Sequence, residues 1–119
     1  MEHRVLIVED SVFMQRVLTD SISTEFTVIG TASNADEALE KFNGLMPDLV
    51  LLDISMPGRN GLRVLEEMLD INPSVKIIIV SALAGLKKEA FEIGAIDFVV
   101  KPFTKEKILE TIRGVLNKS

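Results

Sequence analysis

The sequence contains no cysteine, no tryptophan and no tyrosine, and its single histidine is His3. Without cysteine, the chain has no disulfide framework, no thiolate nucleophile and no thiolate metal ligand. One histidine is too few for a histidine-based zinc site or a ready catalytic triad, and we expect His3 to be a solvated terminal residue. The chemistry open to this chain therefore runs on carboxylates, hydroxyls and lysines.

Long apolar stretches are also missing. The longest runs, such as residues 49–52 and 77–80, are far shorter than the roughly 20 residues that span a bilayer. The first residues lead straight into a short strand-like run, without the apolar core or the cleavage site of a signal peptide. We therefore expect a cytoplasmic protein without membrane insertion.

Basic residues are in the minority, with 13 Lys and Arg against 18 Asp and Glu and a formal net charge of -5. An acidic surface repels phosphate backbones. The longest basic run is the pair Lys87 and Lys88, which we expect on the solvent face of a helix. The charge balance therefore argues against direct nucleic-acid binding.

What the chain does have is 119 residues, of which 47% are hydrophobic, enough for one globular domain over residues 1–119. Short apolar runs alternate five times with segments of helical periodicity. The expected strands are residues 5–8, 26–29, 49–52, 75–80 and 96–100. The expected helices are residues 12–22, 34–44, 62–69, 87–93 and 104–116, with Asn34 and Thr104 as N-caps and Gly44 and Gly94 as ends.

The strands read as unbroken runs of Val, Ile and Leu, without the alternation of a half-exposed sheet. Such strands are buried on both faces, as in a parallel sheet between two layers of helices. The connections are short, which leaves no room for an inserted subdomain. The pattern predicts a single α/β domain.

Polar side chains follow four of the five expected strands, whereas the second strand ends at Gly30 with nothing ionisable. They are Glu9 and Asp10, Asp53, Ser81, and Lys101. Ligands of open parallel sheets bind at the carboxyl ends of the strands, so we expect these side chains to converge. Each alone has an ordinary interpretation as a turn residue, a helix cap or a surface lysine, but their joint pattern favours a site.

Three neighbouring carboxylates repel one another unless a cation lies among them, and Mg²⁺ prefers such oxygen ligands. Lys101 can pair with a phosphoryl oxygen, and Ser81 can donate a hydrogen bond to another. A carboxylate that attacks phosphorus forms an aspartyl phosphate. The loop of residues 56–61 follows Asp53. It is an ordinary βα turn, a source of backbone groups for the metal and phosphate, or both.

Taken in order and at this spacing, the motifs resemble the receiver domain of two-component response regulators over the whole chain. They are residues 5–11 (VLIVEDS), 47–57 (PDLVLLDISMP), 60–61 (NG), 81–82 (SA), 94–95 (GA) and 101–103 (KPF). The helix opening at residues 11–18 is most similar to chemotaxis regulators of the CheY type and to the receiver half of the chemotaxis methylesterase. The resemblance implies a flavodoxin-like, doubly wound sheet of five parallel strands in the order 2-1-3-4-5, with five helices.

The resemblance also implies a role for each polar residue. Asp53 becomes the phosphoacceptor, and Glu9, Asp10, Asp53 and the backbone carbonyl of Ser55 become the Mg²⁺ ligands. Ser81 becomes the switch hydroxyl, and Lys101 becomes the phosphoryl-binding lysine. Phe98 takes the place of the rotating aromatic residue, and the peptide between Lys101 and Pro102 is expected to be cis.

The partners implied are a sensor histidine kinase, whose phosphohistidine is the donor, and a downstream protein that binds the face of helix four, strand five and helix five. We expect a monomer that catalyses only its own phosphorylation and dephosphorylation. Four positions depart from the family pattern, and one of them is Ser55, a small polar residue at a position that influences dephosphorylation in this family. Glu9 stands where many chemotaxis members have Asp, which predicts a metal contact through water, and Phe98 lacks a tyrosine hydroxyl. Leu83 offers no group to position a hydrolytic water, which predicts slow autodephosphorylation.

Three alternatives remain open from the sequence. A Mg²⁺-dependent phosphatase of the haloacid dehalogenase type would need a second Asp where this chain has Ser55. A flavodoxin-like electron carrier would need aromatic residues to stack on a flavin, and the chain has neither Trp nor Tyr. The third is a receiver domain from a larger regulator, such as a methylesterase or a transcription factor.

Overall fold

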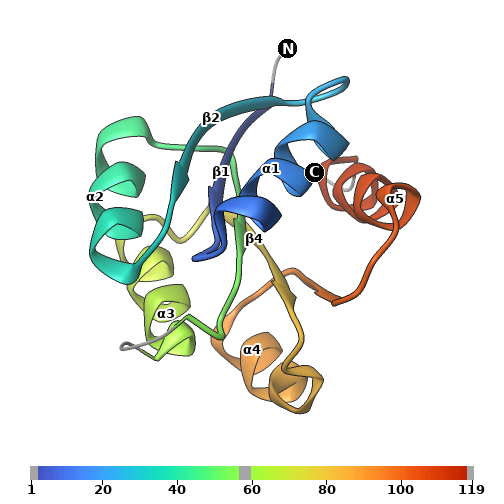
Figure 1. Cartoon of the computed structure of the whole chain (residues 1–119). Helices are drawn as coiled ribbons and strands as arrows, with labels where there is room; N and C mark the ends of the chain where they lie inside the picture. Colours follow the sequence, from blue (N-terminus) through green and yellow to red (C-terminus); the bar gives the residue numbers. More distant parts are fainter. Residues whose placement is uncertain (1–2, 57–59, 118–119) are drawn as a thin grey trace.

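The computed structural model describes residues 3–56 and 60–117, and their strands form one parallel sheet with helices on both sides (Figure 1). The strands are β1 (Arg4–Val8), β2 (Thr27–Ala32), β3 (Leu49–Leu52), β4 (Lys76–Ser81) and β5 (Asp97–Val100). The helices are α1 (Val12–Ile22), α2 (Ala35–Leu45), α3 (Gly61–Ile71), α4 (Lys87–Ile93) and α5 (Lys105–Leu116), and a 3₁₀ turn, η1 (Ala84–Leu86), precedes α4.

The sheet order within the described residues is β2-β1-β3-β4-β5, and every neighbouring pair is parallel. This confirms the predicted α/β class and the 2-1-3-4-5 order. The order reverses beside β1, because the chain first moves to β2 and then crosses back to β3. That reversal opens a crevice at the carboxyl ends of β1 and β3, where open α/β sheets bind ligands.

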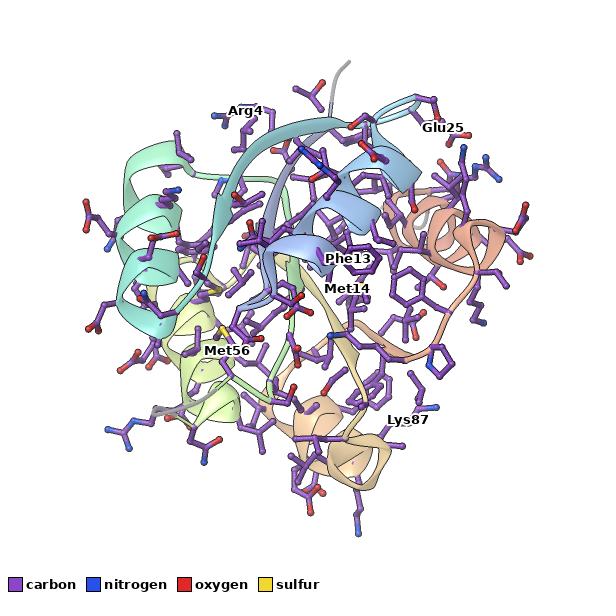
Figure 2. The ribbon with its side chains drawn as sticks, viewed as in Figure 1. Arg4, Phe13, Met14, Glu25, Met56 and Lys87 are labelled. Atoms are coloured by element: carbon purple, nitrogen blue, oxygen red, sulfur yellow. The ribbon has the colours of Figure 1, made fainter. Side chains whose placement is uncertain are left out.

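Alternate residues of β1, β3 and β4 enter two separate apolar layers. In β1, Val5 and Ile7 pack with α1 and α5, whereas Leu6 and Val8 pack with α2, α3 and α4. All four side chains are buried. This double burial explains why residues 5–8 of β1 and all of β3 are apolar. Figure 2 shows the side chains that fill the space between the sheet and its helices.

Side-chain caps begin the helices where the sequence predicts them. The Asn34 side chain accepts a hydrogen bond from the Glu37 amide at 2.8 Å, and Thr104 Oγ1 accepts one from the Lys107 amide at 3.0 Å. Each cap satisfies an amide that has no partner inside the helix. Both predicted caps are confirmed.

The second strand differs from the expected residues 26–29 and runs instead through Thr27–Ala32. Phe26 belongs to the turn that ends α1, because its amide donates to the Ile22 carbonyl at 2.9 Å. The Phe26 ring lies 6.4 Å from the ring of His3. His3 is half-buried, whereas the sequence analysis predicted a solvated residue. Parallel pairing with β1 carries the strand to Ala32, beyond the glycine that was expected to end it.

The second helix also continues past its predicted end at Gly44. It includes Leu45 and is closed by Met46, whose φ of 49° is left-handed and whose amide donates to the Phe42 carbonyl at 3.0 Å. The Arg4 guanidinium holds this turn by donating to the Met46 carbonyl at 2.9 Å. A tertiary contact therefore places a left-handed residue where local sequence favours the glycine.

No helix in residues 3–56 and 60–117 has the length and apolarity needed to cross a bilayer.

Candidate functional site

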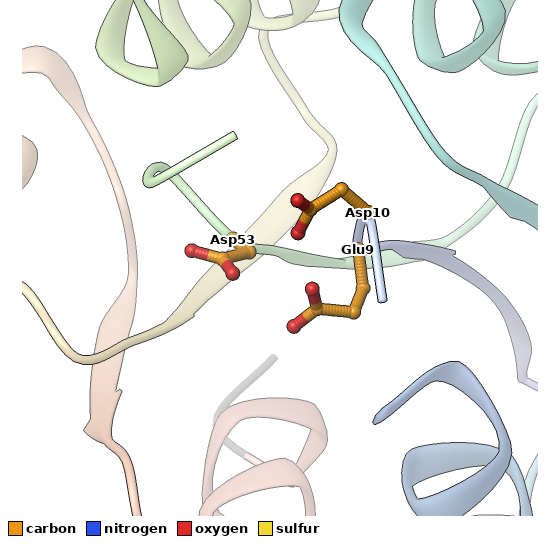
Figure 3. A group of neighbouring side chains, drawn as sticks. All are labelled: Glu9, Asp10 and Asp53. Atoms are coloured by element: carbon orange, nitrogen blue, oxygen red, sulfur yellow. The ribbon is translucent and has the colours of Figure 1, made fainter. Parts of the chain in front are cut away.

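Five polar side chains meet at the carboxyl edge of the sheet, each placed by the end of a strand. Glu9 and Asp10 follow β1, Asp53 follows β3, Ser81 ends β4 and Lys101 follows β5. Since β1 and β3 are neighbours, the carboxylates of Glu9, Asp10 and Asp53 face a common space (Figure 3). One oxygen from each of the three lies within 4.8 Å of the other two. The predicted convergence therefore occurs for the three acids and for Lys101, which pairs with Glu9 and Asp53.

Backbone hydrogen bonds extend the sheet into the site and hold these residues in place. The Asp53 amide donates to the Val8 carbonyl at 3.0 Å, and the Lys101 amide donates to the Ser81 carbonyl at 3.0 Å. The Glu9 amide donates to the carbonyl at the end of β2, at 2.9 Å. The backbone of Glu9, Asp53 and Lys101 is thus held by the sheet, which limits how far their side chains can move apart.

Asp53 is 3% exposed, and both of its carboxylate oxygens accept hydrogen bonds. Oδ2 accepts from Lys101 Nζ at 2.9 Å, while Oδ1 accepts from the Ser55 amide at 2.8 Å and from Ser55 Oγ at 2.6 Å. Burial opposes ionisation of this carboxyl, but these donors outweigh it and hold the pKa of Asp53 below its ordinary value. Asp53 is therefore a carboxylate at neutral pH.

Glu9 is 1% exposed and lies in a different electrostatic position. Its Oε2 accepts from the Ser11 amide at 3.1 Å, and its Oε1 pairs with the Lys101 ammonium. Burial nevertheless raises the pKa of Glu9, because one ammonium is shared with Asp53 and does not fully offset the desolvation.

The Lys101 ammonium is the cation that joins the two buried acids. It bridges Glu9 Oε1 and Asp53 Oδ2, with only 18% of its side chain exposed. Burial disfavours the charged form, but the two carboxylates prevail and raise the pKa of Lys101. It stays protonated and is placed to neutralise negative charge that arrives beside Asp53.

The donor set fits a hard divalent cation. Asp10 is exposed, so its carboxylate adds a third charge at the mouth of the site, beside the buried Glu9 and Asp53. One ammonium cannot balance three carboxylates, and oxygen ligands of this kind are those that Mg²⁺ prefers. Glu9, Asp10 and Asp53 could hold such an ion. The assignment of the Ser55 carbonyl as a further ligand stays a prediction.

The two residues assigned to switching are buried nearby. Ser81 is fully buried, and its Oγ accepts a hydrogen bond from the Leu83 amide at 3.2 Å. Phe98 is 5% exposed and lies in the apolar layer that contains Ala90 of α4. A movement of Ser81 would therefore pull directly on the loop that leads to α4.

The loop after Asp53 includes residues 57–59, which lie outside the described residues, so its predicted part in the site is untested there. On its far side, Gly61 touches the backbone of Ile54 so closely that a Cβ would lie 2.3 Å from the Ile54 Cα. Only glycine fits at this approach. The peptide between Lys101 and Pro102 is cis.

Gln15 was absent from the sequence-based site but contacts it. Its Nε2 donates to the Glu9 carbonyl at 2.6 Å and to Ser33 Oγ at 3.0 Å. The available signal was a lone amide in the apolar stretch 12–18, four residues after the helix N-cap Ser11. A side chain at that position can reach back past the start of the helix.

Comparison with known proteins places these features in one family. Residues 5–113 match the family model described as the response regulator receiver domain. The chemotaxis protein CheY of Thermotoga maritima is 42% identical over 118 residues, which cover 97% of this chain and 98% of that protein. A Borrelia burgdorferi structure described as a CheX-CheY-BeF3-Mg complex superposes with a TM-score of 0.91 and 34% identity, covering 96% of this chain and 89% of that one.

One relative of similar identity is a longer protein. The protein-glutamate methylesterase of Bacillus licheniformis is 43% identical over 105 residues, which cover 83% of this chain but only 29% of that protein. The CheY relative matches over nearly its whole length at almost the same identity. This chain is therefore similar to nearly the whole of CheY and to one part of the methylesterase.

Proposed function

The chain belongs to the family of response regulator receiver domains, and from this premise we propose that it is a CheY-like switch operated by phosphorylation of Asp53. Proteins of this kind act in signalling and are not enzymes with a separate substrate. The observation that carries the proposal is the bridge from Lys101 to Glu9 and Asp53, with the Asp10 carboxylate beside it.

The proposed reaction is transfer of a phosphoryl group from a phosphohistidine of a sensor kinase. An Asp53 carboxylate oxygen attacks phosphorus and forms an acyl phosphate, while the phosphorus–nitrogen bond breaks. The histidine nitrogen leaves with the bonding electron pair and takes up a proton from solvent. Asp53 suits the role of nucleophile because its lowered pKa keeps it ionised.

The surrounding residues supply charge stabilisation. The Lys101 ammonium, 2.9 Å from Asp53 Oδ2, is placed to bind an oxygen of the incoming phosphoryl group. Glu9, Asp10 and Asp53 would hold Mg²⁺, with the Ser55 carbonyl as a further ligand. When bound, this ion screens the phosphoryl oxygens from the acidic site and stabilises the charge that builds up during transfer. The Mg²⁺ in the Borrelia burgdorferi structure supports this assignment.

The output step begins at Ser81. Its hydroxyl hydrogen-bonds the new phosphoryl group, the loop after β4 follows, and Phe98 fills the space that the loop leaves. The phosphoryl group adds about -1.5 to -2 charge at pH 7, and a gap of a few kcal/mol between the two states is small enough for it to overcome. We propose that the face of α4, β5 and α5 then binds a downstream protein.

Dephosphorylation without a partner should be slow. Leu83, which lies two residues after Ser81, is 41% exposed and apolar, so it offers no carboxylate or amide to orient a water molecule. Ser55, two residues after Asp53, contributes only a hydroxyl. A lifetime of seconds or less for the acyl phosphate would contradict this expectation.

The test is labelling by acetyl phosphate in the presence of MgCl₂, followed by intact-mass analysis and acid-lability measurement. The wild type should gain one acid-labile phosphoryl group, and Asp53→Asn should gain none. Asp20→Asn removes an exposed carboxylate from α1 and should label as the wild type does. Labelling that survives in Asp53→Asn would overturn the assignment.

A further inference from the structure

We propose that Gln15 is a positioning residue for the metal site, because it fixes the peptide group that joins Glu9 to Asp10. The inference rests on the proposed Mg²⁺ site and adds a residue that touches neither the ion nor the phosphoryl group. Gln15 lies in the first turns of α1, and its side chain is only partly exposed.

The Glu9 carbonyl is the acceptor of this contact, and its position in the fold explains why it needs one. The Glu9 amide still pairs with β2, through the Ala32 carbonyl at 2.9 Å. The carbonyl of the same residue lies just beyond the last paired residue of β1, where the strand has ended and α1 has not begun. Gln15 Nε2 donates to it at 2.6 Å and so takes the place of a strand partner.

The direction of that carbonyl controls both acids. The peptide plane that contains the Glu9 carbonyl also contains the Asp10 amide, so its rotation turns the two carboxylates relative to each other. The Glu9 side chain is held separately by the Ser11 amide and by Lys101. Asp10, the exposed acid, contacts the Glu9 side chain, a contact that raises the pKa of Glu9. That contact joins two acids whose relative direction is itself set by the peptide between them, so the direction of Asp10 depends on the backbone.

The second Nε2 hydrogen ties the same amide to the loop before α2. It reaches Ser33 Oγ at 3.0 Å, and the Ser33 amide donates to Glu37 Oε1 at 3.0 Å. Glu37 is in turn part of the α2 cap through Asn34. Gln15 is thus braced from two sides: its own helix α1, and the loop that begins α2. A side chain braced in this way is a fixed donor, not a mobile surface amide.

The experiment compares Mg²⁺ binding by the wild type, Gln15→Met and Arg16→Met. Methionine keeps the length of glutamine but removes the donor, and Arg16 is an exposed neighbour on the same helix. Backbone amide NMR shifts of residues 9–11 during MgCl₂ titration give the dissociation constant without any phosphoryl transfer. Gln15→Met should weaken binding about five-fold, the size expected for one lost hydrogen bond.

Two further readouts separate positioning from general destabilisation. The increase in thermal unfolding midpoint produced by a fixed, subsaturating concentration of MgCl₂ should be the same in Arg16→Met as in the wild type and smaller in Gln15→Met. Ser33→Ala, which removes one brace but leaves the contact to Glu9, should weaken binding by less than Gln15→Met does.

The outcomes are distinct. If the wild type does not bind Mg²⁺ near residues 9–11, the proposed function fails. If the wild type binds and Gln15→Met binds equally well, or if Arg16→Met is weakened to the same extent, the assignment of Gln15 fails while the proposed function stands. Selective weakening in Gln15→Met supports the assignment.

Discussion

Helices α4 and α5 lie on either side of β5 in the chain, yet they are attached to the molecule in different ways. Helix α5 has 12 residues and buries six of them, among them Ile108 and Ile112. Helix α4 has seven residues and buries only Ala90. Its lysines, Lys87 and Lys88, are exposed, as the sequence predicts (Figure 2 labels Lys87).

The ends of the two helices also show that α5 is held more firmly than α4. Thr104 caps α5, and Arg113 in its last turn pairs with Glu25, beyond the end of α1. At the start of α4, the N-cap Leu86 makes no side-chain cap, and the amides of Leu86 and Lys87 bond instead to carbonyls of the preceding 3₁₀ segment. The chain therefore anchors α5 along its length and leaves the β4–α4 segment held by few contacts.

The difference between α4 and α5 indicates which part of the protein can move at a small cost in free energy. Elements with little buried apolar area open and move at low free-energy cost. Ser81 joins the site to this weakly held segment, through its contact with the Leu83 amide. A phosphoryl group at Asp53 should thus move α4 more readily than α5.

The largest expected effect is the loss of stability when a buried side chain of α5 is shortened. Ile112→Ala removes a fully buried side chain and should lower the free energy of unfolding by about 2–5 kcal/mol. Phe91→Ala removes a side chain of α4 that is 40% exposed and should cost about 1 kcal/mol or less. Urea unfolding measures both variants. Equal losses would break the comparison.

An intermediate effect is expected at the C-terminal end of α4, its one sharply constrained point. Gly94 has a φ of 136°, and a Cβ there would lie 2.8 Å from Leu69 Cδ1 of α3. Gly94→Ala should therefore cost about 1–3 kcal/mol. Gly114→Ala in α5 meets no atom within 4 Å and should stabilise the protein by up to about 1 kcal/mol. Changes of the same sign would contradict this account of the two helix environments.

The smallest effect concerns the ion pair that ties α5 to the end of α1. A hydrogen bond from Arg113 is the main reason that the pKa of Glu25 lies below its ordinary value. A carboxyl whose pKa is lower in the folded state adds stability above its unfolded pKa and loses it as pH falls through the folded pKa.

Glu25→Gln should therefore lower the urea midpoint slightly at neutral pH, and the difference from wild type should shrink between about pH 6 and pH 3. Glu40→Gln, which changes an exposed carboxylate of α2, serves as the control. A difference for Glu25→Gln that grows on acidification would show that the pair does not stabilise the folded state.

Much of this architecture was predictable because the signals are local. The unbroken apolar runs fix the parallel sheet, and the polar residues that follow them, such as Asp53 and Lys101, fall at one edge for that reason alone. The caps Asn34 and Thr104 are also local signals, since each bonds an amide three residues later.

The features that sequence analysis missed depend on contacts between distant segments. Pairing with β1 extends β2 to Ala32, and Arg4 supports the turn at Met46 that closes α2. Gln15 joins the end of β1 to the loop before α2, a link that no periodicity reveals. The sequence of α4 has ordinary helical spacing and so does not reveal that the helix is weakly attached. The weak attachment follows from its packing in the folded protein.

The central claim is that phosphorylation of Asp53 acts on the weakly held β4–α4 segment through Ser81. Hydrogen exchange, measured residue by residue with MgCl₂ and with or without acetyl phosphate, tests it most directly. The account predicts that amide exchange changes chiefly in residues 81–94, changes less in residues 105–116, and does not respond in Asp53→Asn. An unchanged exchange pattern in residues 81–94 of the phosphorylated wild type, or the same response in Asp53→Asn, would contradict it.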